Sequence, residues 1–326
     1  MASDIAVAVL GAGKMGLIHC QSIAATPGLK LVAASSSAPE RLAAVREEFD
    51  IATYPSHEQL LADRKVQWVV IATTTDKHKH WALKALAAGK QLIIEKPVAL
   101  SYPEAEEIFA EASRRKLAVT VYQSRRWDND FTLVRDLLRK GTLGQVYRIE
   151  SRYTDFSSGW GGWGAQGLAN PWRLKKAYGG GLLADWGTHL LDQLLLLIDA
   201  EAVGLYAGMY GRIWTTEVDD HFWAELHFAD GVSARVEASN NARIPLPRWY
   251  IVGTAGTLQV RGGDLTVWDS AVIRNEFEGR PQEIRIPIDQ PELSTGFYQA
   301  FVKALAGGGP LPVQPAEVLP RLQRNG

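Results

Sequence analysis

Short apolar runs alternate with helical patterns over residues 1–121, and this alternation constrains the fold more than any other feature. The apolar runs are typical of β-strands and cover Ile5–Leu10, Leu29–Ser35, Val66–Ala72, Gln91–Glu95 and Leu117–Tyr122. The helical patterns lie between them, near Lys14–Ala25, Pro39–Glu48, Lys77–Ala88 and Pro103–Lys116. Several runs are apolar throughout, as expected of strands that helices cover on both faces. Since such alternation implies right-handed crossovers, the sequence predicts a doubly wound parallel sheet.

The pattern changes after about residue 124. A helix is predicted near Trp127–Lys140 and a short one near Phe297–Ala306. Strand-like runs lie at Val146–Thr154, Val203–Tyr210, His221–Phe228, Ser233–Ser239, Arg248–Val252, Thr257–Arg261, Leu265–Trp268 and Glu283–Ile288. Turn signals such as Asp230-Gly231 separate several of them, which predicts a mainly antiparallel sheet with helices on one face, an α+β arrangement. We therefore expect two domains, residues 1–123 and residues 124–326.

The composition is that of an ordinary globular protein and argues against some partners. The 326 residues carry a formal net charge of -1, so nothing favours nucleic acid or an anionic membrane surface. The longest apolar run, around Leu190–Ile198, is too short to span a bilayer. Residues Met1–Asp4 lack the pattern of a signal peptide. Cys20 is the single cysteine, which excludes an intrachain disulfide and favours a reducing, cytoplasmic compartment.

A glycine-rich turn follows the first predicted strand directly. Residues 11–16 read G-x-G-x-x-G between a strand and a helix, the dinucleotide-binding fingerprint of a Rossmann domain. Gly11 permits the tight turn, Gly13 lets the backbone approach a pyrophosphate, and Gly16 allows close packing of the helix on the strand. The pyrophosphate then meets N–H groups at the helix N-terminus. The predicted cofactor contacts of this turn are Gly11, Gly13, Lys14, Met15 and Gly16.

The end of the second strand discriminates between NADP and NAD. An acidic residue there would bond the ribose 2′-hydroxyl of NAD, but no acid occurs before Glu40. The hydroxyls of Ser36 and Ser37 can donate to a 2′-phosphate, and Arg41 can neutralise it. The residues therefore favour NADP over NAD. The alternative is that Arg41 is simply a solvated helix residue.

The tripeptide Glu95-Lys96-Pro97 ends another apolar strand, at the edge where doubly wound sheets bind ligands. Pro97 restricts Lys96 to an extended backbone. An ammonium group held there can bond a substrate oxygen and lower the barrier to its deprotonation. Glu95 can orient the lysine. A surface ion pair at a strand end is the alternative interpretation.

The segment from Gly179 to Ile198 combines a helical pattern with a polar face. Its leucines predict a mostly buried helix, yet four polar residues at i, i+3, i+4 and i+7 share one face: Asp185, Thr188, His189 and Asp192. Polar groups inside a core need partners, water or a ligand. An acid one turn from a histidine is a candidate proton-transfer pair, or else a structural pair. It could also supply two metal ligands, but we find no third by spacing and predict no metal.

Three of these motifs together resemble one protein family. The Gly11–Gly16 fingerprint, Glu95-Lys96-Pro97 and the Gly179–Asp192 segment resemble, in this order, the glucose–fructose oxidoreductase and inositol dehydrogenase family, also written Gfo/Idh/MocA. Within it, Val121–Asp128 resembles the branch that contains NADP-dependent scyllo-inositol dehydrogenases. The resemblance covers essentially the whole chain. It implies an N-terminal Rossmann domain and a C-terminal domain with an open, mostly antiparallel sheet for substrate binding and oligomerisation.

The resemblance also implies roles for individual residues. The family's catalytic lysine falls on Lys96, and its acid and histidine fall on Asp185 and His189. Its arginine after the last Rossmann strand falls on Arg125 or Arg126. The residues expected to contact substrate are Arg125, Arg126, Asp155, Trp163, Arg173, Asp185 and His189. For Arg173, a structural ion pair is as well supported as a substrate contact. For Trp163, which lies in a glycine-rich stretch, packing in the protein interior is as well supported as a substrate contact.

On the cofactor side, the family's threonine after the fourth strand falls on Thr73. Thr74 and Thr75 depart from the Thr-Pro-Asn that is common in the family. Thr73 is expected near the cofactor, and so are Glu95 and Lys96. The implied cofactor is a pyridine nucleotide, with NADP as the preferred hypothesis and NAD as the other.

The expected reaction is hydride transfer between the nicotinamide and a secondary alcohol or ketone of a polyol, inositol or sugar. In oxidation, His189 accepts the hydroxyl proton, Lys96 stabilises the alkoxide, and Asp185 orients the substrate or the base. The alternative is a catalytically silent sensor or regulator that binds nucleotide and sugar, which predicts damage to this trio. The bulky residues of runs such as His221–Phe228, together with the resemblance, predict a homodimer or homotetramer through the second sheet.

Overall fold

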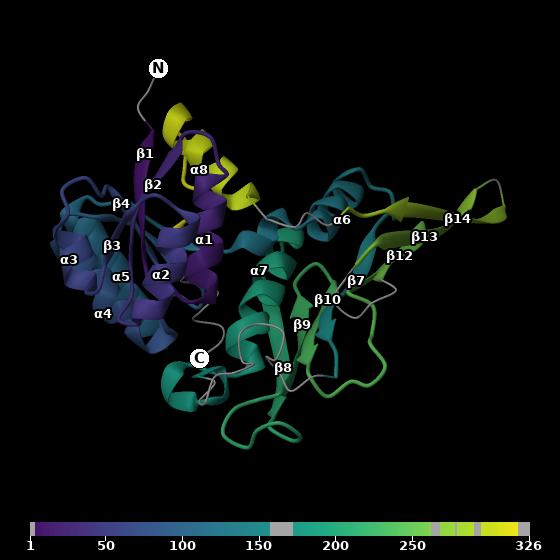
Figure 1. Ribbon diagram of the computed structural model, residues 1–326. Coiled ribbons are helices and arrows are strands. Elements are labelled where there is room, and N and C mark those ends of the chain that lie inside the picture. The colour runs from purple at the N-terminus through teal and green to yellow at the C-terminus, as the bar shows by residue number, and fades with distance from the viewer. Residues whose placement is uncertain (1–3, 157–171, 262–267, 278, 290–294, 319–326) are drawn as a thin grey trace. The chain divides into compact units, whose positions relative to one another are not determined.

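The chain divides into two compact units, drawn as ribbons in Figure 1. The computed structural model describes residues 4–156, 172–261, 268–277, 279–289 and 295–318. The first unit comprises residues 1–124 and 293–326, and the second comprises residues 125–292. Each unit is built on its own sheet.

The first unit contains a six-stranded parallel sheet in the order β3-β2-β1-β4-β5-β6. Its strands are β1 (Ile5–Leu10), β2 (Leu29–Ser35), β3 (Ala52–Tyr54), β4 (Trp68–Ile71), β5 (Gln91–Glu95) and β6 (Val119–Tyr122). The inner strands are almost wholly buried, as the continuous apolar runs require. The predicted doubly wound sheet is confirmed. Its order reverses between β1 and β4, where such sheets bind ligands.

Five helices connect these strands. They are α1 (Lys14–Ala24), α2 (Pro39–Glu48), α3 (His57–Ala62), α4 (His78–Ala87) and α5 (Tyr102–Arg115), and a 3-10 turn, Thr75–Lys77, precedes α4. The sequence analysis missed β3 and α3 because both are short and carry weak periodic signals. Ser56 marks the start of α3, since its hydroxyl accepts the Gln59 N–H at 3.4 Å.

Helix α8 (Gly296–Gly307) belongs to the first unit, although the sequence analysis grouped residues 124–326 together. Phe301 packs against Trp68 of β4, with ring centroids 4.7 Å apart. Phe297 packs in the same way against Tyr122 of β6, at 4.8 Å. An apolar helix face does not specify which sheet it covers, so the sequence alone could not place α8.

The second unit contains an eight-stranded sheet in the order β14-β13-β12-β11-β7-β10-β9-β8. Its strands are β7 (Val146–Thr154), β8 (Ala202–Tyr210), β9 (His221–Phe228), β10 (Ser233–Ser239), β11 (Trp249–Gly253), β12 (Gly256–Arg261), β13 (Ser270–Phe277) and β14 (Arg280–Pro287). Only β7 and β10 pair in parallel, so the mostly antiparallel prediction is confirmed. Because these two strands run parallel, their C-terminal ends meet at one edge of the sheet.

The sequence analysis missed one strand of this unit, β13, which begins at Ser270. The predicted strand Leu265–Trp268 lies outside the described residues except for Trp268. In β13, Ala271 and Ile273 turn to the core. Val272 between them is apolar as well, and the residues from Arg274 to Glu276 are all polar, so the run lacks the alternation that marks a strand with one buried face.

The two faces of the second sheet differ in chemistry. Helices α6 (Asn129–Arg139) and α7 (Thr188–Leu197) contribute apolar side chains to the core against one face. The opposite face carries a row of charges across β7 and β10, where Arg152 lies 3.6 Å from Glu237, and Arg235 lies 3.1 Å from the same carboxylate. We call this second face the charged face.

The apolar segment after Gly179 does form a helix, but not a straight one. It begins with a π-helical turn, η6 (Leu183–Gly187), which continues into α7. Asp185 lies in the wide turn, whereas His189 and Asp192 lie on α7. The spacing of Asp185 and His189 therefore differs from the one-turn spacing of a regular α-helix. Such single π-turns are frequent at functional sites.

Candidate active site

The glycine turn of the first unit has the backbone geometry that its motif predicts. Gly11 has a φ of 105°, and a Cβ there would lie 2.7 Å from the carbonyl oxygen of Ala72. Its N–H donates to the carbonyl of Ser35 at 3.0 Å, which ties the turn to the end of β2. A Cβ on Gly16 would collide with the carbonyl oxygen of Gly11, so α1 lies directly against the turn.

The N-terminus of α1 has a basic neighbour. Gly13 is the N-cap of α1, and a Cβ on it would lie 3.7 Å from Nη1 of Arg41. Lys14 and Met15 occupy the first turn of the helix, which contains no acidic residue. The positive end of the helix dipole and the Arg41 guanidinium therefore create a corner that attracts anions.

Two serines follow β2 beside this corner. Ser36 is buried, and its hydroxyl accepts the Ala38 N–H at 3.2 Å, which leaves its own proton for donation. Ser37 is exposed. Neither residue is acidic, so nothing at the end of β2 itself would repel a 2′-phosphate.

Thr73 and Lys96 follow β4 and β5, so the topology brings them to the same sheet edge as the glycine turn. His78, fully buried at the start of α4, lies between these two loops. Its Nδ1 is 2.8 Å from the carbonyl oxygen of Pro97, and its Nε2 is 3.2 Å from that of Thr73. Burial lowers the pKa of His78. The histidine thus joins the two loops that the sequence assigned to cofactor and catalysis.

Glu95 does not lie as the sequence analysis expected. Its carboxylate is buried, with Oε1 3.0 Å from Nε2 of His19 and Oε2 accepting the backbone N–H of Lys96 at 2.9 Å. Burial raises its pKa, but the His19 hydrogen bond and the charges of His19 and Lys96 outweigh this, so the pKa lies below the usual value. Both carboxylate oxygens are thus engaged inside the unit, which argues against the predicted cofactor contact.

In the second unit, candidate residues gather where β7 and β10 end. Asp155, directly after β7, is 6% exposed, and its N–H donates to the carbonyl of Ser239 at 2.9 Å. Asn240, directly after β10, is also buried, and η6 packs on β10. The parallel strand pair therefore brings Asp155 and Asn240 to the edge near which η6 lies.

A stack of flat side chains forms the centre of this group. Trp186 of η6 stacks on Tyr153, with ring centroids 3.7 Å apart, and the Arg125 guanidinium lies 4.0 Å from the Trp186 ring centroid. His189 meets Trp186 edge-on, at 6.2 Å. Burial raises the pKa of Tyr153, and the nearby charge of Asp155 adds to it. Arg125, Asp155 and His189 thus lie in one cluster, which a rigid aromatic pair holds in place.

Asp185 completes this cluster with a basic partner. Its Oδ2 is 3.5 Å from Nε of Arg173, so the ion pair that the sequence left open is present. Gly181, with a φ of 106°, lets the chain turn into η6. The Asp219 carboxylate accepts the N–H of Leu183 at 2.7 Å and so stabilises the start of the helix that carries Asp185. Sequence reasoning missed Asp219.

Arg126 occupies a different place from Arg125. It is buried and donates through Nε and Nη2 to the two oxygens of Asp192, at 2.7 and 2.8 Å. This bidentate pair joins the start of the second unit to α7. It argues against the predicted substrate contact of Arg126, and it explains why the polar face of the helix contains Asp192.

A second buried network was not foreseen from the sequence. Arg248, whose side chain is fully buried, donates to Ser151 Oγ at 2.6 Å and to Oε1 of Gln193, and its Nε lies 3.3 Å from Asp130. Gln193 of α7 in turn donates to the carbonyl of Arg125 at 2.5 Å. Arg248 therefore supports, through Gln193, the backbone that carries the Arg125 guanidinium.

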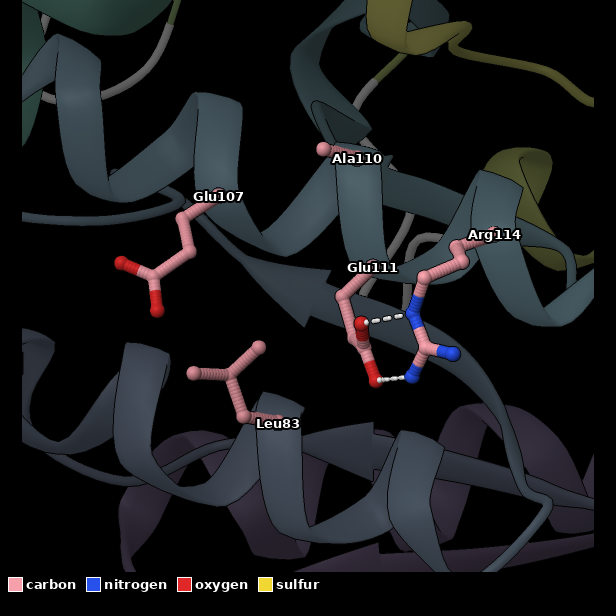
Figure 2. A pocket seen from close by; sticks show the side chains of 5 residues that line it. All are labelled: Leu83, Glu107, Ala110, Glu111 and Arg114. Atoms are coloured by element: carbon pink, nitrogen blue, oxygen red, sulfur yellow. Dashed lines mark hydrogen bonds and ion pairs between the residues drawn. The ribbon is translucent and has the colours of Figure 1, made fainter.

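Other parts of the chain add little to the site. Figure 2 shows an open groove between α4 and α5 that Leu83, Glu107, Ala110, Glu111 and Arg114 line, and it contains none of the predicted site residues. Trp163 lies outside the described residues.

Among the residues that the structure describes, no group of three potential ligands could hold a metal ion. In the same described ranges, no helix is long and apolar enough to cross a membrane.

The parallel sheet and the glycine turn define a dinucleotide-binding Rossmann domain, which an α+β domain follows. The sequence model of the Gfo/Idh/MocA oxidoreductase family, described by its NAD-binding Rossmann fold, matches residues 5–123. The model of the GFO/IDH/MocA C-terminal domain matches residues 131–259. This chain belongs to the Gfo/Idh/MocA family.

Similar proteins agree with this assignment. The crystal structure of an NAD-binding protein from Listeria innocua superposes with a TM-score of 0.85 at 32% identity, over 99% of this chain and 93% of that one. An uncharacterized oxidoreductase of Schizosaccharomyces pombe is 30% identical over 66% of this chain. A scyllo-inositol 2-dehydrogenase (NADP(+)) of Bacillus subtilis is 27% identical over 52% of this chain. The chain covers 58% and 45% of the latter two, less than two thirds of their own lengths.

Proposed function

We propose that this protein is a dehydrogenase or reductase that acts on a secondary alcohol or ketone of a polyol, inositol or sugar. The observation that carries the proposal is the cluster of Arg125, Asp155, Asp185 and His189 around the Tyr153–Trp186 stack. Acidic, basic and aromatic groups of this kind suit a polyhydroxylated substrate, because hydroxyls need donors and acceptors and the ring needs a flat face. The B. subtilis relative named above acts on scyllo-inositol, which supports the same class.

Three residues of this chain would then divide the chemistry. When bound, the nicotinamide takes a hydride from the carbinol carbon or returns it. His189 would accept the proton of the same hydroxyl, which leaves a ketone, and would return it in reduction. The Lys96 ammonium would stabilise the alkoxide that develops on that oxygen. Asp185, restrained by Arg173, would accept a hydrogen bond from a neighbouring hydroxyl.

Substitution of these residues tests the assignment. A panel of polyols, inositols and sugars, with their ketones, is screened with NADP(H) and NAD(H) by absorbance of the reduced nicotinamide. On the best substrate, Lys96→Ala and His189→Ala should each lower kcat about a hundredfold or more. Lys84→Ala, on the solvent side of α4, is the matched control and should be unchanged. Full activity of either site variant would overturn its role, and ligand binding without any turnover would favour the sensor alternative.

NADP is the preferred cofactor because Arg41 and Ser36 surround the end of β2, where an acid would otherwise select NAD. The expected result is tighter binding of NADPH than of NADH in a fluorescence titration. Arg41→Ala should weaken NADPH binding about tenfold and leave NADH nearly unchanged. Arg46→Ala on the same helix, whose side chain bonds Thr53 instead, is the control. Equal or tighter binding of NADH by the wild-type protein contradicts the proposal.

A homodimer or homotetramer through the second sheet is part of the proposal. On the edge strand β8, Tyr206 is 72% exposed and packs on Trp223, next to the charged face. Exposed apolar groups on an edge strand favour pairing with a second copy. Light scattering should give a dimer or tetramer, and Tyr206→Asp should dissociate it, whereas Ile244→Asp outside the sheet should not. A wild-type monomer at micromolar concentration would contradict this part.

A cytoplasmic location is proposed from the single cysteine. Cys20 is fully buried, and burial raises its thiol pKa to about 12, so it stays a protonated and unreactive thiol. This agrees with a reducing compartment. Localisation of a tagged full-length chain in fractionated cells tests it, and recovery outside the cytoplasm would refute it.

A further inference from the structure

A chain of buried polar groups lies behind Lys96 and uses residues from three distant parts of the sequence. Tyr298 of α8 places its hydroxyl 2.6 Å from Nδ1 of His19 of α1. Nε2 of His19 lies 3.0 Å from Oε1 of Glu95, and Oε2 of Glu95 accepts the Lys96 N–H at 2.9 Å. Tyr298 and His19 are fully buried, and Glu95 is 6% exposed. No step of the proposed reaction uses Tyr298 or His19.

The direction of the inner hydrogen bond follows from the carboxylate. The pKa of Glu95 lies below its usual value, so the carboxylate is ionised and only accepts. Nε2 of His19 therefore carries a proton and donates it to Glu95. Burial raises the pKa of Tyr298 well above its usual value, so the phenol keeps its proton, and its oxygen lies within hydrogen-bond distance of Nδ1 of His19.

Residues from several helices and strands surround the hydrogen-bonded chain of Tyr298, His19 and Glu95. The Tyr122 ring of β6 packs edge-on against the His19 imidazole, with centroids 4.3 Å apart. Cys20 of α1 and Tyr122 add to the electrostatic environment of Tyr298. His78 of α4 and Lys96 itself are the other charged or titratable groups that act on Glu95. The groups that act on the Glu95 carboxylate are therefore two histidines, His19 and His78, and one lysine, Lys96.

We propose that Tyr298 and His19 are positioning residues for Lys96, because together they fix the Glu95 carboxylate against the Lys96 backbone. This inference rests on the proposed function, in which Lys96 contacts the reacting oxygen. His19 lies on α1, the helix that follows the glycine turn, so the same imidazole also joins the cofactor-binding helix to the lysine. Helix α8 would then support catalysis without touching the substrate.

The variant Tyr298→Phe tests the inference with little change of volume. Loss of the hydroxyl should lower kcat about tenfold, the equivalent of one hydrogen bond, while KM for the cofactor changes less than about twofold. The pH profile of kcat should also shift, because loss of the phenol removes a hydrogen-bond partner of the His19–Glu95 pair beside Lys96. Phe301→Leu is the control, since it removes packing from the same helix against Trp68 without touching the chain. It should lower thermal stability and leave kcat unchanged.

A second readout does not depend on turnover. Nitrogen-15 NMR of histidine-labelled protein distinguishes protonated from unprotonated ring nitrogens. In the wild type, Nε2 of His19 should carry a proton, and His19→Gln identifies the signals of this residue. In Tyr298→Phe, the Nδ1 signal should shift, because its hydrogen-bond partner is gone. An unprotonated Nε2 in the wild type, or an Nδ1 signal that is the same in Tyr298→Phe, would overturn the inference.

The two proposals fail in different ways. If Lys96→Ala is inactive and Tyr298→Phe matches the wild type in kcat and pH profile, the positioning inference alone is overturned. An equal loss of kcat in Phe301→Leu would overturn it as well, since general packing would then explain the effect. If Lys96→Ala keeps full turnover, the proposed role of the lysine fails, and the inference fails with it even when the His19 signals change.

Discussion

The two units hold their candidate catalytic residues in different ways. Behind Lys96, the first unit has a chain of hydrogen bonds with a single carboxylate, Glu95. Around the helix of His189, the second unit has arginine–carboxylate pairs instead, among them Arg126–Asp192 and Arg248–Asp130. The first arrangement orients one backbone segment, and the second joins α6, α7 and the start of β11 into one block.

This difference predicts that substitutions in the two networks lower the free energy of unfolding by different amounts. Removal of one neutral hydrogen-bonding group costs about 0.5–1.5 kcal/mol. Removal of one partner of a buried ion pair leaves an uncompensated charge and costs about 3–5 kcal/mol. The second unit should therefore fail by unfolding, whereas the first should fail by losing activity while it remains folded.

Substitution of Arg248 by methionine should have the largest effect. The Asp130 carboxylate would lose its buried cation, and Gln193 would lose a donor, so the free energy of unfolding should fall by about 3–5 kcal/mol. Urea denaturation followed by tryptophan fluorescence measures this. Arg274→Met removes a pair that is exposed to solvent and should cost less than about 1 kcal/mol. Equal costs for the two variants would contradict the comparison.

The Arg126–Asp192 pair should show coupling in a double-mutant cycle. Arg126→Met and Asp192→Leu should each destabilise the protein by about 3 kcal/mol, because each leaves a buried charge. The double variant should cost less than the sum of the single variants, since neither charge then remains. Additive costs, measured by the same urea titrations, would mean that the two side chains do not stabilise each other.

The pH dependence of stability should differ in sign between Glu95 and Asp128. The pKa of Glu95 is lowered in the folded protein, so its stabilising contribution is present above about pH 4.5 and is lost as the pH falls through the folded pKa. The pKa of Asp128 is raised, mainly by burial, so its contribution is present below about pH 3.8 and is lost as the pH rises through the folded pKa.

Glu95→Gln and Asp128→Asn test this opposition. The cost of Glu95→Gln should be about 1–3 kcal/mol at neutral pH and should shrink on acidification. The cost of Asp128→Asn should shrink in the other direction, as the pH rises toward neutrality. Denaturant titrations between about pH 3 and pH 7 give both slopes. If the costs of both substitutions changed with pH in the same direction, the direction of one of the two pKa shifts would be contradicted.

The smallest expected effect concerns α8. A Cβ on Gly307, the last residue of that helix, would meet no atom within 4 Å. Gly307→Ala should therefore stabilise the protein by up to about 1 kcal/mol through helix propensity. Since α8 belongs to the first unit, differential scanning calorimetry should shift the transition of that unit alone. A destabilised variant would mean that the helix end is held in a conformation that only glycine accepts.

Local signals explain how much of this molecule the sequence could predict. The turn at Gly11–Gly16 and the tripeptide Glu95–Pro97 follow strands directly, so both their structure and their place at the sheet edge follow from neighbouring residues. Motifs and the family resemblance named Asp155 and His189 as site residues. In the structure both lie around the Tyr153–Trp186 stack. The partners of Arg126 and Arg248 are 66 and 55 residues away, at Asp192 and Gln193, and only tertiary packing determines such pairs.

The π-turn and the burial of Glu95 were beyond the sequence for a related reason. An i, i+4 pattern assumes a regular α-helix, and the extra residue of η6 depends on how Asp219 and Gly181 hold its start. The orientation of Glu95 depends on His19 and Tyr298, which approach from other elements. In both cases the sequence identified the site residue, Asp185 or Glu95, and could not identify the residues that contact it.

The return of α8 to the first unit has a consequence for synthesis on the ribosome. The whole second unit, residues 125–292, is translated between β6 and α8. At about 5–20 residues per second, this separates the two parts of the first unit by about ten to thirty seconds. During that time Trp68 and Tyr122 lack the aromatic rings that later cover them. Until α8 emerges from the ribosome, the nascent first unit therefore exposes these two aromatic side chains to solvent.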